Sequence, residues 1–397
     1  MFDFFKFAHQ SRTIVTESSG NNVVNCLEPP VCHLPYHFAQ LSELLESIVL
    51  VSEKAARIAR AIRRDSHLLS LLVEEKTGNK KNPRFNKDFK TITDVLVQEV
   101  VKYDLTRKFP ALTGHIYGEE TNEIGLITGE KVCLKIDSSK ENTFNLLETL
   151  CDDLAAHLLA DIVHEEVLLS ELPGNPTLPE VSVDIPLEGI AIWIDPIDST
   201  GEYINPRAEK DGDVFTAGLN CVTVLIGAFS RESGQPVIGV INQPFHTAPD
   251  GSEWIGDVIW GLKYADTSIC SLQERTASKI VIISSSESDD IKRRLTDGGF
   301  KLIEAAGAGY KLLCVIQGHV SAYVISKSTT FFWDTCGCDA VLRSLGGGIV
   351  SYDKTISGNS ENNFLAYSNI SDPCNHGGLI AYTDEKILDE IVDALKK

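Results

Sequence analysis

The segment that most constrains this chain reads Trp193-Ile-Asp-Pro-Ile-Asp-Ser-Thr200. An apolar run over residues 189–194 predicts a buried strand, and Pro196 is expected to end that strand just after Asp195. Asp198 follows three positions after Asp195, and either of the next two hydroxyl residues can cap a helix. A strand that turns into a helix in this way directs both carboxylates toward one point.

The chemistry of this turn indicates a site for a cation and a phosphate. Backbone N–H groups at the start of a helix bind anions, and neighbouring carboxylates bind hard cations such as Mg²⁺. Asp195 and Asp198 would supply the carboxylates, and a helix that begins near Ser199 or Thr200 would supply the N–H groups. Phosphate-ester chemistry is therefore the leading hypothesis.

Composition narrows the class of protein. The chain has 397 residues, of which 43% are hydrophobic and 23% charged, as in a globular protein that buries a sizeable core. Its formal net charge of −20 argues against a nucleic-acid partner, because binding a polyanion requires an excess of Lys and Arg. No apolar run approaches the ~20 residues needed to span a bilayer, so we expect no membrane insertion. The cysteines lack zinc-ligand spacing and favour a reducing compartment, so we expect a cytoplasmic location. We also expect the chain to be a monomer.

The pattern of elements divides the chain into two lobes. Residues 1–40 are polar and turn-rich and predict a poorly ordered extension. Residues 41–275 predict an N-terminal α+β lobe with an acidic, partly helical insertion over 121–188. From residue 276 to residue 397 strands alternate with helices, which predicts a C-terminal α/β lobe. We expect a layered α/β fold with the site between the lobes.

Further carboxylates stand at the ends of predicted elements. Asp94 lies at a helix start, Glu119 and Glu120 follow a strand, and Asp334 precedes a helix. Each alone is also explained as an acid that offsets a helix dipole. If the acids converge, each pair of like charges about 4 Å apart repels by roughly 4 kcal/mol at an effective dielectric constant near 20. Several such pairs would rival the ~5–15 kcal/mol stability of a domain, so cations or protons must offset them.

The identity of the cation follows from the donor types. Carboxylates without His or Cys favour Mg²⁺ over zinc. Two such ions can activate water and stabilise the departing oxygen of a phosphate ester. Phosphatases with an aspartate nucleophile are the alternative, and they use Asp-x-Asp-x-Thr with the acids two positions apart. Here Asp195 and Asp198 are three apart and no second match occurs, so the pattern favours attack by water.

Together these motifs resemble the Mg²⁺-dependent, lithium-sensitive inositol phosphatase superfamily, whose signatures are Asp-Pro-Ile/Leu-Asp-Ser/Gly-Thr and a later Trp-Asp. The likeness covers about residues 41–397, and the long gap between Glu120 and Asp195 is typical of the branch that acts on inositol polyphosphates. Other segments that carry the resemblance are Val51–Ala56, Asp88–Thr91, Asp94–Val100, Gly118–Glu120, Val240–Phe245, Ala305–Lys311 and Gly346–Val350.

The resemblance implies a fold and an activity. The fold would be that of the inositol monophosphatase and fructose-1,6-bisphosphatase group, with alternating layers of helices and sheets. The activity would be hydrolysis of the 1-phosphate of inositol 1,4-bisphosphate and inositol 1,3,4-trisphosphate, with two or three Mg²⁺ ions and inhibition by Li⁺. Two alternatives remain. One is a 3′(2′),5′-bisphosphate nucleotidase with the same metal centre, and the other is a catalytically silent inositol-phosphate-binding protein.

The resemblance also implies roles for individual residues. Thr200, hydrogen-bonded to Asp94, would orient and deprotonate the attacking water. The metal ligands would be Glu119, Glu120, Asp195, the backbone carbonyl of Ile197, Asp198 and Asp334. The substrate contacts would come from Asp198, Ser199, Thr200, Ser286, Gly307, Ala308, Lys311 and Thr329.

Three positions bear on substrate specificity: two at which relatives have a lysine and this chain does not, and Lys311. Relatives have a lysine two residues past the serine that matches Ser286 and another just before the Trp-Asp, whereas this chain has Ser288 and Phe332. If either lysine binds a distal phosphate, the preference for bisphosphate and trisphosphate substrates is altered here. Lys311 is equally explained, from the residues alone, as a solvated helix lysine or a ligand contact, and the resemblance favours the ligand.

Overall fold

Two sheets and the helices that cover them make up the part of the chain that the computed structural model describes. That part is residues 37–65, 68–69, 73–75, 89–125, 131–174, 176–248, 250–251, 253–272, 278–358 and 363–397. Residues 36–397 belong to one compact unit. Most of the expected N-terminal extension lies outside the described residues, but Phe38–Gln40 form strand β1, which pairs with β7 (Asp184–Pro186).

The larger sheet contains the segment that opens with Trp193. Its strand order is β14-β13-β12-β11-β8-β4. β4 is parallel to β8, and the other neighbours are antiparallel. The strands are β4 (Ile116–Gly118), β8 (Ile190–Asp198), β11 (Thr223–Ser230), β12 (Pro236–Gln243), β13 (Asp257–Tyr264) and β14 (Thr267–Cys270).

Strand β8 is buried on both faces. Ile192 and Ile194 join the core on one side of the sheet, whereas Ala191 and Trp193 join the core on the other side. This alternation follows from the two-residue period of a strand. A strand enclosed in this way holds the residues at its carboxyl end in fixed positions.

The structure corrects one expectation about β8. The strand does not end at Pro196 but continues to Asp198. Its register against β11 shifts between the pairs Asp195–Leu225 and Asp198–Thr223, which is a β-bulge. A bulge leaves one residue out of the ladder, so a proline without an N–H group is tolerated there. The bulge therefore lies directly between the two carboxylates.

The smaller sheet has the order β16-β15-β17-β19-β18. β15 is parallel to both of its neighbours, and β19 is antiparallel to β17 and β18. The carboxyl ends of β16, β15 and β17 therefore lie at one edge. The strands are β15 (Ile280–Ile283), β16 (Lys301–Glu304), β17 (Ala322–Ile325), β18 (Gly348–Ser351) and β19 (Leu379–Tyr382).

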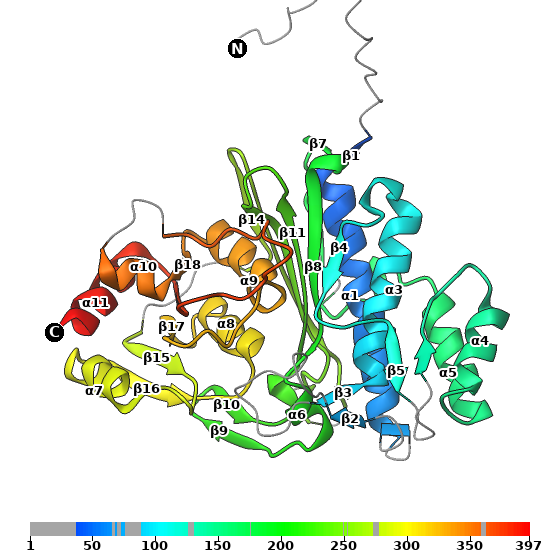
Figure 1. Cartoon of the computed structure of the whole chain (residues 1–397), viewed down its shortest axis with the longest axis horizontal. Helices are drawn as coiled ribbons and strands as arrows, with labels where there is room; N and C mark the ends of the chain where they lie inside the picture. Colours follow the sequence, from blue (N-terminus) through cyan, green and yellow to red (C-terminus); the bar gives the residue numbers. More distant parts are fainter. Residues whose placement is uncertain are drawn as a thin grey trace, which may run out of the picture. The chain divides into compact units, whose positions relative to one another are not determined.

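Helices and sheets alternate in layers (Figure 1). Helices α1 (Leu41–Arg64) and α3 (Ile92–Lys108) cover one face of the larger sheet, and α8 (Ala308–Ile316) and α9 (Phe332–Ser344) lie between the sheets. The far face of the smaller sheet packs against α7 (Asp289–Asp297), α10 (Tyr352–Ser357) and α11 (Glu385–Lys396). The layered α/β fold is confirmed. None of the helices in the described ranges is long and apolar enough to cross a bilayer.

Helix α9 lies unusually close to the larger sheet. Gly227, Gly239 and Gly261 are paired side by side across β11, β12 and β13. A Cβ atom on Gly239 would lie 2.7 Å from the carbonyl carbon of Gly337, and one on Gly261 would lie 2.7 Å from Cα of Val341. The glycines thus let the helix backbone rest on the sheet, where any side chain would push it away.

The acidic insertion, which the sequence predicted to be partly helical, contains two short helices. α4 (Lys140–Glu148) and α5 (Asp153–His164) are separated by a break at which Asp152 caps α5. Leu147 is therefore buried, whereas Leu154 is 80% exposed. The remaining elements are β2 (Val73–Glu75), β3 (Phe89–Thr91), β5 (Glu123–Gly125), β6 (Lys131–Cys133), α6 (Thr200–Ile204), β9 (Glu209–Asp211), β10 (Val214–Ala217) and the 3₁₀ turns Pro110–Leu112, Leu169–Glu171, Leu187–Gly189 and Leu219–Cys221.

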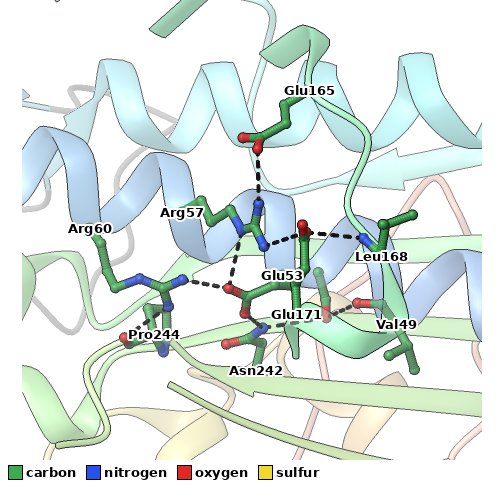
Figure 2. A network of polar contacts seen from close by, with 10 residues as sticks. Val49, Glu53, Arg57, Arg60, Glu165, Leu168, Glu171, Asn242 and Pro244 are labelled. Carbon is green, nitrogen blue, oxygen red and sulfur yellow. Dashed lines mark hydrogen bonds and ion pairs between the residues drawn. The ribbon is translucent and has the colours of Figure 1, made fainter. Parts of the chain in front are cut away.

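A buried polar network fixes α1 to its surroundings (Figure 2). Glu53 accepts a hydrogen bond of 2.5 Å from Arg60 and one of 3.3 Å from Asn242 of β12. Arg57 extends the network to Glu171 at 2.9 Å, in the segment that follows α5. Because each buried charge has an opposite partner, the attraction between partners offsets part of the desolvation cost. The network thereby sets the position of α1 on the sheet.

Candidate active site

Three aspartates from distant parts of the sequence meet where β8 ends. One carboxylate oxygen each of Asp195, Asp198 and Asp334 lies within 4.8 Å of the other two. All three residues are buried, and Asp195 is only 2% exposed. Asp195 and Asp198 flank the bulge of β8, and Asp334 belongs to the first turn of α9. The structure therefore brings together the acids that the sequence singled out in the strand and in the Trp-Asp motif.

Backbone N–H groups of α8 hold the Asp198 carboxylate. Asp198 accepts hydrogen bonds from Ala308 N at 3.3 Å and Gly309 N at 2.9 Å, and Thr223 donates a third at 3.4 Å. A Cβ atom on Gly309 would lie 2.6 Å from Oγ1 of Thr223, and one on Gly307 would lie 2.9 Å from Oδ2 of Asp198. The close approach of α8 therefore requires both glycines.

Asp334 is oriented by its own helix. Its Oδ2 atom accepts a hydrogen bond of 2.5 Å from the backbone N–H of Phe331, in a capping interaction at the start of α9. The sequence had predicted Asp334 just before the helix, and the structure places it three residues inside. The difference matters because the cap fixes the carboxylate against the helix end.

Burial and mutual repulsion shift the protonation equilibria of these acids. Burial, followed by the charges of Glu119 and Asp198, raises the pKa of Asp195 well above its ordinary value. Burial and the charge of Asp198 raise the pKa of Asp334 to about 7. Burial also raises the pKa of Asp198, while the nearby Lys311 ammonium lowers it. Three carboxylates in such surroundings need a compensating positive charge to be ionised together.

The donor set fits a hard divalent cation. Oδ1 of Asp195 is buried and accepts no hydrogen bond, so this oxygen has a lone pair directed at no donor. The converging ligand atoms are all carboxylate oxygens. Mg²⁺ prefers such oxygens, and a cation would remove the repulsion that raises the pKa values. The residues present therefore fit the ion that the sequence predicted.

A hydroxyl–carboxylate pair lies beside the bulge. Oγ1 of Thr200 lies 3.3 Å from Oδ1 of Asp94 and 3.1 Å from the carbonyl oxygen of Ile197. Asp94 is buried, and its second oxygen accepts hydrogen bonds from the N–H (2.7 Å) and the hydroxyl (2.5 Å) of Thr91. The carboxylate of Asp94 is thus fixed in place with one oxygen directed at Thr200. The contact expected between Thr200 and Asp94 is present.

The loop after β4 carries Glu119 and Glu120. The charge of Glu119 raises the pKa of Asp195, which places Glu119 within electrostatic reach of the cluster. The backbone of Glu120 is clamped by the side chain of Gln98, which donates to its carbonyl at 2.6 Å and accepts from its N–H at 3.0 Å. Sequence reasoning missed Gln98, although it lies on the buried face of α3 one turn after Asp94.

Most of the other predicted substrate contacts lie around the same place. Ser199 has a left-handed backbone (φ 71°) at the start of α6, and its hydroxyl oxygen would lie 2.6 Å from a Cβ atom on Gly307. Ser286 and Thr329 follow β15 and β17, at the edge where β16 leads to Gly307 and Ala308.

Lys311 has contacts that the sequence did not predict. Its ammonium donates to the carbonyls of Ala305 and Gly307, 3.2 Å away in the first case, and lies 5.2 Å from the ring centre of Tyr323. The side chain is completely buried. It stabilises the turn that presents the α8 N–H groups to Asp198, and contact with a substrate stays a prediction.

A separate cavity of about 610 Å³ lies on the outer side of α1. It is lined by Arg57, Arg60, Arg64 and apolar side chains of α5, and by none of the clustered acids. Arg57 and Arg60 are already paired with glutamates (Figure 2). The aspartate cluster is therefore the better candidate site, because burial and mutual repulsion raise the pKa values of its carboxyl groups.

Comparisons with known proteins identify the family of this chain. The chain matches the inositol monophosphatase family over residues 44–388. It is 40% identical over 392 residues to inositol polyphosphate 1-phosphatase of Homo sapiens, covering 89% of this chain and 97% of that protein. It is 28% identical over 314 residues to 3′(2′),5′-bisphosphate nucleotidase 1 of Homo sapiens, covering 77% and 82%. Among solved structures, extragenic suppressor protein suhB from Bartonella henselae matches with a TM-score of 0.50 and 13% identity, over 89% of this chain and 99% of that chain. The superfamily expected from the motifs is confirmed, and the chain belongs to the inositol monophosphatase family.

Proposed function

We propose that this chain is a Mg²⁺-dependent phosphatase that removes the 1-phosphate of inositol 1,4-bisphosphate and inositol 1,3,4-trisphosphate. The observation that carries the proposal is the convergence of Asp195, Asp198 and Asp334 beside the Thr200–Asp94 pair. The substrate class follows from the 40% identity to inositol polyphosphate 1-phosphatase. The 28% identity to a bisphosphate nucleotidase makes phosphorylated nucleotides the second candidate substrate class.

In this proposal each group has one task. The clustered acids, with Glu119, Glu120 and the carbonyl of Ile197, would hold two or three Mg²⁺ ions. Bound Mg²⁺ supplies positive charge next to the phosphate and makes water more acidic. The hydroxyl of Thr200 would take a proton from the attacking water while it passes its own proton to Asp94. Water oxygen then bonds to phosphorus, the bond to the inositol oxygen breaks, and that oxygen leaves as a hydroxyl after it takes a proton from solvent. No phosphoenzyme forms.

The surroundings of the site complete the proposal. Ser199, Thr200, Gly307 and Ala308 would contact the phosphate that is cleaved. Residues 41–275 and 276–397 would act as two lobes, because the acids of β8 come from the first and Asp334 from the second. The proposal further includes inhibition by Li⁺, a monomeric state and a cytoplasmic location.

A phosphate-release panel tests the proposal. The substrates are inositol monophosphates, bisphosphates and trisphosphates and 3′,5′-nucleotide bisphosphates, each with Mg²⁺ and with or without Li⁺. We expect turnover of the inositol polyphosphates to exceed that of the nucleotides. Faster turnover of the nucleotides would support the second candidate, and no release from any substrate would support a silent binding protein.

Substitution of Asp195 tests the mechanism. Asp195→Asn removes one charge from the cluster at nearly constant shape, so we expect turnover to be abolished while the fold survives. Asp289→Asn is the matched control, because Asp289 is an exposed acid in the first turn of α7. Near-wild-type activity of Asp195→Asn would remove this residue from the mechanism.

A further inference from the structure

The three parallel strands of the smaller sheet end next to the aspartate cluster. The segment after β16 leads into α8, whose N–H groups bind Asp198, and the segment after β17 leads into α9, which carries Asp334. β15 lies between β16 and β17 in the sheet. Residues 284–288, which follow β15, therefore lie between the segments that follow β16 and β17. Both of those segments lead to residues of the aspartate cluster. Ligands of α/β proteins bind at such carboxyl ends of parallel strands.

Lys327 places a positive charge at this edge. Its side chain is exposed, and its ammonium donates to the backbone carbonyl of Ser286. Among the residues that the structure describes, Lys327 forms no ion pair, whereas the neighbouring Lys292 is paired with Glu304 at 2.6 Å. Lys311 is fully buried against two carbonyls. Because an ammonium has three donors, Lys327 retains two for an anion.

Two hydroxyl groups belong to the same two segments as this contact between Lys327 and Ser286. Oγ1 of Thr329 is buried and has no hydrogen-bond partner, although it lies two residues from Lys327. Oγ of Ser286 lies 3.0 Å from Oγ of Ser284 and can donate to another acceptor. An ammonium with nearby hydroxyls is a donor set suited to a phosphate, whose oxygens are all acceptors.

The two positions that depart from the family pattern offer no charge here. Ser288 caps α7 by accepting a hydrogen bond of 3.3 Å from Ile291 N. Phe332 is buried, with its ring 5.9 Å from Trp193 and 5.3 Å from Tyr367. Neither side chain therefore supplies a positive charge for a second phosphate. A polyphosphate substrate would therefore need its distal positive charge from another residue of this edge.

We propose that Lys327, with the hydroxyls of Thr329 and Ser286, binds a phosphate of the substrate other than the one that is cleaved. Lys327 thereby sets the preference for polyphosphates over monophosphates. This inference rests on the proposed function, since it concerns the substrate of the same site. It gives this chain a source of specificity in the segment after β17, in place of charges at positions 288 and 332.

The test compares two substrates in the wild type and in Lys327 variants. We expect Lys327→Met to lower the ratio of kcat/KM for inositol 1,4-bisphosphate to that for inositol 1-phosphate by roughly 10- to 100-fold, as for the loss of a charged hydrogen bond. The change should lie in KM, and Lys327→Arg should restore most of the ratio. Lys279→Met is the control. Lys279 is an exposed lysine that precedes β15, at the end of the strand away from Ser286, and it is paired with Glu390 of α11. A ratio for Lys327→Met within twofold of the wild type would overturn the inference.

A binding measurement separates this inference from the proposed function. Calorimetric titration of inositol 1,4-bisphosphate into full-length wild type and Lys327→Met, with matched melting temperatures, requires no turnover. We expect the variant to bind more weakly by a similar factor. If the wild type releases no phosphate from any substrate, the proposed function fails, and equal affinities in this titration would still refute the role of Lys327.

Discussion

Asp195 shows how the surroundings of one residue can indicate that its site binds a cation. Its carboxylate is enclosed by an apolar sheet, lies close to two other aspartates, and has an oxygen that no donor reaches. A native structure rarely leaves a buried oxygen in this condition, because the desolvation cost is about 1–3 kcal/mol or more for a charged group. The arrangement is explained when a cation completes it.

Thr200 provides the first prediction at this scale. In the proposed mechanism Thr200 passes a proton to Asp94, so Thr200→Ala should lower kcat by about 100- to 10,000-fold, the usual contribution of a proton-transfer group. KM and the melting temperature should change little, because Thr200 lies at the edge of the site. Steady-state phosphate release measures the effect.

The matched variant is Thr200→Ser, which keeps the hydroxyl and removes only a methyl group. We expect it to retain activity within about tenfold of the wild type, a small part of the contribution of a proton-transfer group. Equal activities of the Ala and Ser variants would show that the hydroxyl takes no part in the reaction.

At the scale of elements, the glycine row of the larger sheet positions the metal site. Gly227, Gly239 and Gly261 allow α9 to lie directly on β11, β12 and β13. Since Asp334 occupies the first turn of α9, the height of the helix above the sheet sets its distance to Asp195 and Asp198. A sheet with larger residues at these positions would hold the carboxylate too far away.

Gly239→Ala tests this dependence. The added methyl group would collide with the backbone of Gly337, and overpacking of this kind costs about 1–3 kcal/mol of unfolding free energy. We also expect a higher Mg²⁺ concentration for half-maximal activity, because α9 must move. Chemical denaturation and Mg²⁺ titration of activity measure the two effects.

Gly189→Ala is the control for this variant. A Cβ atom at Gly189 would meet only Pro186 at 3.8 Å, an ordinary contact. Its stability and Mg²⁺ dependence should match those of the wild type. A Gly239→Ala protein that is less stable but has an unchanged Mg²⁺ dependence would show that the glycine row serves packing alone.

For the whole molecule, we expect the aspartate cluster to couple folding to metal binding. Burial and repulsion raise the pKa values of Asp195 and Asp334. Without a bound cation, the ionised carboxylates therefore destabilise the fold. A ligand that binds only the folded state at 100 times its dissociation constant stabilises the fold by about 2.7 kcal/mol. Mg²⁺ should therefore raise the melting temperature by several degrees, and a chelator should reverse the change.

The Asp195→Asn protein distinguishes this coupling from a general salt effect. Without Mg²⁺ it should melt above the wild type, because one source of repulsion is gone, and its response to Mg²⁺ should be smaller. Differential scanning calorimetry at constant ionic strength measures both. A wild type whose melting temperature ignores Mg²⁺ would contradict the assignment of the cluster as a metal site.

The sequence by itself indicated the layered α/β fold through its pattern of elements, the family through the resemblance of its motifs, and the acids as candidate metal ligands. These follow from local information, because strand periodicity, helix starts and the Asp195–Thr200 motif are contiguous in the chain. The same local reasoning was wrong at Pro196, because a bulge lets the strand continue past the proline.

Only the tertiary structure decided which residues surround those acids. The clamp of Gln98 on Glu120, the burial of Lys311 and the contact of Lys327 with Ser286 each join segments that the sequence separates. Such contacts depend on how closely helices and sheets approach, which packing sets and local patterns do not encode. The motifs therefore predicted which acids form the candidate site, whereas the fold decided how these acids are positioned and which side chains surround them.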